Sequence, residues 1–282
     1  MPIHDQGYRR YAGTRARTGT NWVVITRAGI RTMLEKRVFL GLLLAASAPF
    51  LFRVLQIYAN ANSPQLAALA PVTAEMFRDY LDGFVQHLFI FFITVYVGAG
   101  LIANDRRANA LQIYLSKPLT RGEYVFGKLA ILMAFLALVT WIPAITLLLV
   151  QVAFAGNFTF LMNHAYLFPA ITVYAFLEIV TAASTMLALS SLSNSSRYVA
   201  VLYAVLLFFT QAIYGVMYAV TRNSSFSWMS LSASLSQMSS VIFRQPLRYD
   251  TPWPVSLLVI VGAIVVSGLV LERRVRGVEV VA

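Results

Sequence analysis

The stretch LAILMAFLALVTWIPAITLLLVQVA, residues 129–153, decides the fold of this chain. It contains 25 residues and no charged side chain. An α-helix of this length, rising about 1.5 Å per residue, crosses the roughly 30 Å hydrocarbon core of a bilayer. Such a helix satisfies all of its backbone polar groups internally, as a segment surrounded by lipid requires. The sequence therefore predicts a transmembrane helix here.

Five further apolar runs of similar length surround this one. They cover residues 38–58, 84–103, 165–192, 199–220 and 254–271. The chain of 282 residues is 59% hydrophobic and only 12% charged, whereas a soluble domain has about 25% charged residues. This composition excludes a soluble globular protein and a disordered one. We predict an all-α polytopic membrane protein with six transmembrane helices in residues 38–271. Prolines inside the runs, at Pro49, Pro143 and Pro169, are expected to kink the helices.

The net charge of +11 arises from 22 Lys and Arg residues against 11 Asp and Glu residues. Seventeen of the basic residues and six of the acidic ones lie in segments that six spans place on one side of the membrane. Basic loops are retained in the cytoplasm, so we expect both termini there, in a bacterial inner membrane. The basic excess on this side equals the whole net charge. It is explained by topology and headgroup contact, and no nucleic-acid partner is expected.

Two segments precede the first span. Residues 1–20 form a basic N-terminal segment, and nearly forty residues before the first apolar run argue against a signal peptide. Residues 21–37 are expected to form an amphipathic helix in the cytoplasmic interface of the membrane. Its apolar positions are Trp22, Ile25, Gly29, Ile30, Met33 and Leu34. Arg27 and Arg31 lie on the opposite face, toward anionic headgroups. The alternative is a plain cytoplasmic extension of the first span.

The remaining polar segments complete the organisation. Residues 104–128 form a cytoplasmic loop between the second and third spans, and residues 272–282 form a cytoplasmic tail. The outer loop at 221–253 is rich in serine. Its large apolar side chains recur every three or four residues, at Trp228, Leu231, Leu235, Met238 and Ile242. This period predicts a short helix or a re-entrant pair that dips into the outer leaflet.

No motif indicates a catalytic, cofactor-binding or metal-binding site. Residues 122–128 (GEYVFGK) match the first seven positions of a phosphate-binding P-loop, but Leu129 stands where Mg²⁺ requires Ser or Thr. The three histidines, His4, His87 and His164, are scattered, and the chain has no cysteine. A metal site is therefore not expected, and we expect this chain not to hydrolyse ATP.

Glu178 is the one ionisable residue near the centre of a predicted span. A carboxylate at this depth costs several kcal/mol unless it faces the helix bundle or is protonated. It is either a proton or substrate contact on a transport pathway or a neutral acid hydrogen-bonded between helices. The sequence leaves both open.

Residues 98–128, GAGLIANDRRANALQIYLSKPLTRGEYVFGK, carry the most specific pattern in the chain. An apolar helix end is followed by an acidic–basic pair, small residues before a leucine, a proline, a Thr-Arg pair and a Gly-Lys pair. These features fall on Ile102, Asp105-Arg106, Asn109-Ala110-Leu111, Pro118, Thr120-Arg121 and Gly127-Lys128. The pattern resembles the loop between the second and third spans of ABC-2-type transporter permeases. The layout of six spans with an amphipathic helix before the first is also similar to that family.

The resemblance implies the membrane subunit of an ATP-binding-cassette transporter. Such chains work as homodimers or heterodimers, here through spans one and five, and most often export their cargo. ATP and Mg²⁺ would bind a separate ATPase subunit docked beneath the amphipathic helix and the 104–128 loop. The residues expected to dock and couple that ATPase are Asp105, Arg106, Arg107, Leu111, Tyr114, Leu115, Pro118 and Arg121. The aromatic-rich spans suit an amphipathic or lipid-like cargo.

The amphipathic character of the 104–128 loop also agrees with the docking of an ATPase subunit. Residues 106–115 would form a short helix with an apolar strip and a charged rim, which Pro118 ends because proline disfavours helix before it. Two rival functions stay open: a proton-coupled secondary transporter that uses Glu178, and a non-transporting membrane anchor or regulatory subunit.

Overall fold

The computed structural model describes residues 21–63, 65, 71–110, 119–155 and 159–275, and these are helices and short connections without a strand. Six helical stretches are long and apolar enough to cross a membrane. They are Arg37–Asn62, Ala74–Arg107, Arg121–Ala155, Leu167–Leu192, Ser196–Thr221 and Trp253–Arg274. The prediction of an all-α polytopic membrane protein with six spans is confirmed.

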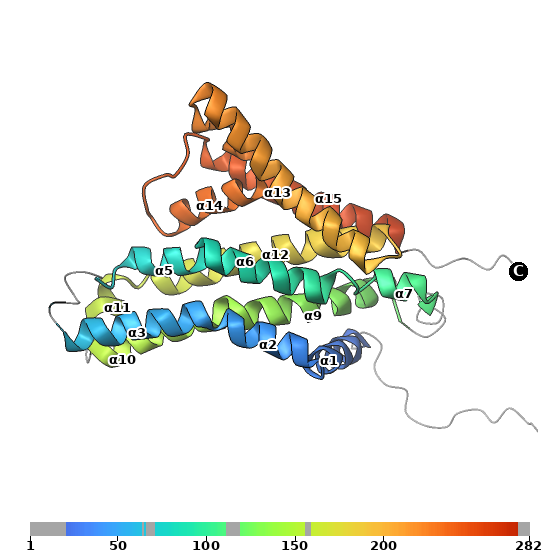
Figure 1. Cartoon of the computed structure of the whole chain (residues 1–282), viewed down its shortest axis with the longest axis horizontal. Helices are drawn as coiled ribbons and strands as arrows, with labels where there is room; N and C mark the ends of the chain where they lie inside the picture. The colour runs from blue at the N-terminus through green and yellow to red at the C-terminus, as the bar shows by residue number, and fades with distance from the viewer. Residues whose placement is uncertain (1–20, 64, 66–70, 111–118, 156–158, 276–282) are drawn as a thin grey trace, which may run out of the picture.

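Several of these spans are divided into shorter helices (Figure 1). The elements in chain order are α1 Asn21–Leu34, α2 Arg37–Ala46, α3 Ala48–Asn62, α5 Ala74–Leu81, α6 Phe84–Ile93, the π-helical turn η1 Thr94–Gly98, α7 Ala103–Arg107, α9 Arg121–Val139, α10 Trp141–Ala155, α11 Thr159–Asn163, α12 Leu167–Leu192, α13 Ser196–Thr221, the 3₁₀ helix η2 Ser224–Met229, α14 Leu231–Ile242 and α15 Trp253–Arg274.

Helix α12 is the central element of the fold. It packs against α9, α10, α13, α14 and α15, and a larger share of it is buried than of any other span. Its polar face is buried as well, at Thr181, Ser184, Thr185, Ser190 and Ser191. Most of these hydroxyls donate to carbonyl oxygens one turn earlier in the same helix, so they have partners although they are buried. Displacing α12 would therefore disturb most of the bundle.

Two of the three prolines stand at breaks. Pro49 lies in the first turn of α3, after the break from α2 at Ser47, and Pro143 lies in the first turn of α10, after the break from α9 at Thr140. The prediction of a helix kink at Pro169 was wrong. Helix α12 begins only at Leu167, so Pro169 lies in its first turn, where no intrahelical N–H bond is lost.

The second span is interrupted twice. Between α5 and α6 the chain breaks at Asp82 and Gly83, where a β-carbon at position 83 would stand 2.5 Å from the carbonyl oxygen of Asp79. Between η1 and α7 the helix unwinds, and Ser190 of α12 replaces the lost backbone bonds. Its hydroxyl accepts from the N–H groups of Ile102 and Ala103, at 3.1 Å each. It also donates to a carbonyl oxygen of the same unwound turn.

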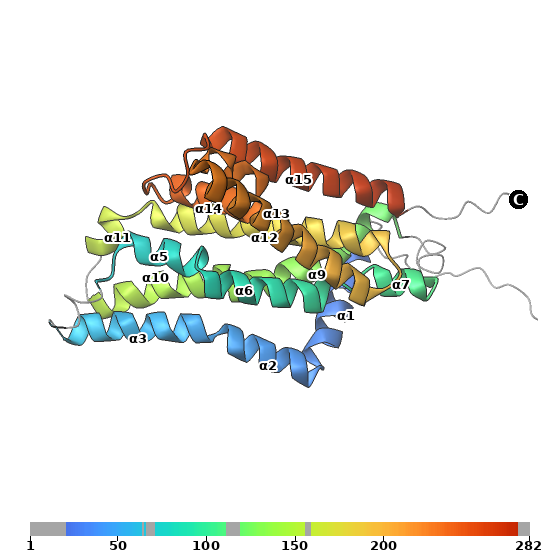
Figure 2. The same ribbon diagram turned by 45° about the horizontal axis from the view of Figure 1, so that its top comes forward.

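The two ends of the bundle differ in character. Helix α1 lies across the end that also holds α7 and the C-terminal end of α15 (Figures 1 and 2). We call this the basic end, because it carries Arg27, Arg31, Lys36, Arg37, Arg106, Arg107, Arg121, Lys128, Arg197, Arg273 and Arg274. Toward the opposite end α13 rises away from α6, and α14 lies between α13 and α12 (Figure 1). The outer segment expected to be helical is thus the helix α14, preceded by η2, which contains Trp228.

Candidate functional site

At the basic end, α1 packs across the first turns of α9. The rings of Trp22 and Phe126 meet edge-on with centroids 4.9 Å apart. A β-carbon at Gly127 would stand 3.1 Å from the carbonyl oxygen of Trp22, and one at Gly29 would overlap the side chain of Ile131. Both glycines permit the close crossing. The apolar face of α1 is therefore covered at least in part by protein.

The short helix α7 is fixed to two spans at the same end. Asp105 accepts a hydrogen bond from the hydroxyl of Tyr124 and pairs with Nζ of Lys128, both at 2.7 Å. Arg106 donates to the carbonyl oxygen of Ser191 on α12. Because the Asp105 and Lys128 side chains are only 18% and 12% exposed, this pair is shielded from the screening that weakens surface salt bridges. A shift of α7 would strain contacts with both α9 and α12.

The second polar centre lies toward the opposite end and joins α6, α12 and α14. Oε1 of Glu178 lies 3.1 Å from Nε2 of His87, which in turn lies 3.8 Å from Oδ1 of Asp82. Oδ1 of Asp82 also accepts hydrogen bonds from the hydroxyls of Tyr174 (3.1 Å) and Ser236 (2.8 Å). Both carboxyl groups are almost fully buried. A buried carboxylate must be paired or neutral, so these groups form one coupled charge cluster.

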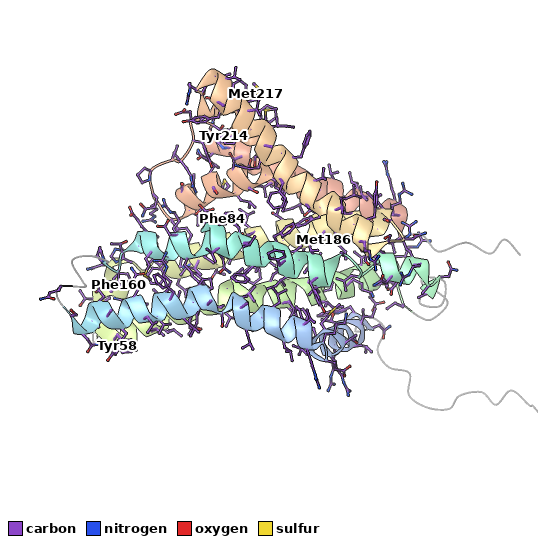
Figure 3. All side chains as sticks on the ribbon, viewed as in Figure 1. Tyr58, Phe84, Phe160, Met186, Tyr214 and Met217 are labelled. Carbon is purple, nitrogen blue, oxygen red and sulfur yellow. The ribbon has the colours of Figure 1, made fainter. Side chains whose placement is uncertain are left out.

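This cluster forms one side of a cavity of about 430 Å³. The cavity is lined by Asp82, Phe84, His87, Leu88, Phe91, Leu207, Phe208, Gln211, Ser232, Ala233, Ser236, Arg248 and Tyr249. Figure 3 shows Phe84 on the side of α6 that faces α14. Two of these lining residues are in contact, because Nη1 of Arg248 lies 3.3 Å from Oδ2 of Asp82. Burial raises the pKa of the Tyr249 phenol, so this hydroxyl stays neutral.

A family model described as ABC-2 family transporter protein matches residues 27–270. The chain belongs to this family. No match was found among curated proteins. The permease family accounts for the six apolar spans and for a membrane subunit that is not itself catalytic.

In this ABC-2 permease the predicted docking residues separate into three groups. Asp105 and Arg106 are engaged inside the protein, whereas Arg107 and Arg121 are exposed at the basic end. Leu111, Tyr114, Leu115 and Pro118 lie outside the described residues. On α1, Trp22 is half-buried against α9, and Arg27 and Arg31 are exposed.

Sequence reasoning identified Glu178 but missed the groups that face it. His87 precedes Glu178 by 91 residues and Asp82 precedes it by 96, and Arg248 follows it by 70. No local spacing links these positions. The available signal was Asp82-Gly83, a polar pair with a helix-breaking residue at the start of an apolar run.

The described residues do not form a metal-binding site. Within the described residues, no group of three or more His, Asp or Glu side chains is arranged to hold a metal ion. The cluster at Asp82 contains donors of mixed charge, including a guanidinium. Its chemistry is therefore that of ion pairing and hydrogen bonding.

Proposed function

We propose that this ABC-2 permease is the membrane subunit of an ATP-driven exporter and that a separate ATPase, holding ATP and Mg²⁺, docks at its basic end. The observation that carries the proposal is the fixation of α7. Asp105 and Arg106 connect the segment that enters the 104–128 loop to α9 and α12. A packed element of this kind transmits a partner's movement as a rigid shift.

The proposal places the basic end and both termini in the cytoplasm of a bacterial inner membrane. The concentration of Lys and Arg at that end supports this orientation. The exposed cations of α1, Arg27 and Arg31, would face anionic headgroups or the docked ATPase. An amphipathic or lipid-like cargo agrees with the aromatic side chains of the cavity at the opposite end.

The docking site is tested with charge reversals of the exposed residues Arg107 and Arg121. The tagged permease is purified in mild detergent from its own host, and the co-purified ATPase is quantified together with ATP turnover. R107E/R121E is expected to lose most of the bound ATPase, because it places two acids on a surface proposed to meet it through cations. The matched control is Arg222→Glu, an exposed arginine at the end of α13. Equal recovery of the ATPase with both variants would place docking elsewhere.

A proton-coupled secondary transporter is the second candidate, favoured by the 3.1 Å approach of His87 to Glu178. In that case E178Q abolishes transport, and no ATPase accompanies the permease in mild detergent. If reconstitution with the ATPase gives ATP turnover and no movement of any cargo, the chain acts as a regulatory subunit or anchor instead.

A further inference from the structure

The cavity between α6, α13 and α14 has a polar side that includes the carboxyl group of Asp82. The two oxygens of this carboxyl group have different numbers of partners. Asp82 is buried, and its Oδ1 accepts from Tyr174 and Ser236. Asp82 lines the cavity, and among the described residues the partner found for its Oδ2 is Arg248 alone, at 3.3 Å. The Arg248 side chain is 57% exposed and belongs to the connection between α14 and α15. One oxygen of a buried carboxylate is thus neutralised by a cation that comes from the solvent side.

The balance of charge around this oxygen favours a cation. Asp82 and Glu178 supply two buried acids, and His87 lies between them. Oε2 of Glu178 has no hydrogen-bond partner within the described part of the chain. Among the residues that the structure describes, Arg248 alone brings a permanent positive charge to the cluster. Because an anion in the cavity would have to approach the Asp82 carboxylate, the site selects against negative ligands.

Four aromatic side chains also line the cavity. Phe84 is 79% exposed and Phe208 is 59% exposed, although both line the cavity. Phe91 meets Phe208 edge-on at 5.4 Å between ring centroids, and Tyr249 adds a fourth ring to the lining. Aromatic faces attract a positive charge within about 6 Å and also cover an apolar body.

We propose that this cavity binds an amphipathic organic cation, whose charged group replaces the Arg248 guanidinium at Oδ2 of Asp82 while its apolar body lies against Phe84, Phe91 and Phe208. As a statement about cargo this rests on the proposed export function, but binding to the cavity requires no ATPase. Arg248 then acts as a tethered competitor that keeps Asp82 paired when the cavity is empty.

The experiment uses two probes of the same shape and opposite charge, tetraphenylphosphonium and tetraphenylborate. Each is equilibrated by dialysis with the full chain in lipid nanodiscs, and the uptake of empty nanodiscs is subtracted. We expect saturable binding of the cation and no saturable binding of the anion. Removing the acid in D82N should weaken cation binding about tenfold or more, and removing the competitor in R248Q should tighten it. Asp79→Asn, an exposed acid on the helix α5 that ends just before Asp82, is the matched control and should leave binding unchanged.

A second variant distinguishes the loss of the Asp82 charge from a disturbance of the fold around it. Tyr174→Phe removes one hydrogen bond to Asp82 but keeps the carboxylate, and Tyr174 does not line the cavity, so this variant should retain cation binding within about twofold. Equal binding of both probes, or equal loss in D79N and D82N, would overturn the proposal, as would a loss in Y174F as large as in D82N. If the cation binds as expected and no ATPase associates, the export function fails and this site stands. If the ATPase docks and the cation does not bind, this site alone fails.

Discussion

Ser190 shows how one hydroxyl permits a break in a transmembrane helix. It accepts from two backbone N–H groups of the unwound turn before α7 and donates to the carbonyl oxygen of Ala99 at 2.9 Å. It is fully buried, and water cannot replace these bonds at low cost. The residue therefore fixes the position of α7 relative to α12.

Replacing this hydroxyl tests the claim directly. Ser190→Ala should destabilise the fold by about 1–3 kcal/mol, because buried backbone groups lose their partner. Thermal unfolding in detergent measures the effect. Ser195→Ala, at an exposed serine between α12 and α13 whose side chain makes no capping hydrogen bond, should shift the midpoint by far less. Equal midpoints for the two variants would show that the unwound turn finds other partners.

Two glycines of α9 offer a second test at the residue scale. Gly127 lies under α1, whereas a β-carbon at Gly122 would meet nothing within 4 Å. G127V should therefore push α1 away from α9, and G122V should not. The chain has no cysteine, so Ile25→Cys introduces a single thiol on the packed face. Its reaction with a thiol reagent should accelerate in G127V and stay unchanged in G122V; the opposite order would refute the close crossing.

Among the elements, α7 connects most clearly to function. Its carboxylate at Asp105 pairs with Lys128 on α9, and the two residues lie 23 positions apart. The sequence pattern that resembles the ABC-2 family includes both residues, but it did not predict that they pair with each other. The length of the apolar runs predicted the spans, because burial in lipid depends on composition along the chain. It could not predict this contact, because the pair forms only when two separate helices meet.

A charge swap tests this pair. Asp105→Lys should lower the unfolding temperature, because it places two ammonium groups together in a largely buried position. The double variant Asp105→Lys, Lys128→Asp should recover part of the loss. Thermal unfolding of the two single variants and the double variant gives the coupling energy. Additive losses would mean that the pair contributes nothing and that α7 is positioned by Arg106 and Ser190.

At the scale of the whole molecule, the spans divide into a buried core and an exposed periphery. A larger share of α12 is buried than of any other span, whereas α2, α3 and α13 expose many of their large apolar side chains. Lipid can cover such faces, and so can a second copy of the chain. The dimer predicted through spans one and five would cover part of these apolar faces with protein, because an apolar face packs equally well against lipid or another helix.

Single-cysteine cross-linking distinguishes these two coverings. Val201 on α13 and Val265 on α15 are exposed to similar extents, 57% and 53%, and α15 belongs to a span for which no dimer contact is predicted. In native membranes, oxidation should link V201C into dimers and leave V265C monomeric, since a disulfide requires Cα atoms within about 7 Å. Dimers from V265C alone would move the interface to span six. Cross-links from neither position would leave α13 facing lipid, and the cargo path would then lie within one subunit, between α6, α13 and α14.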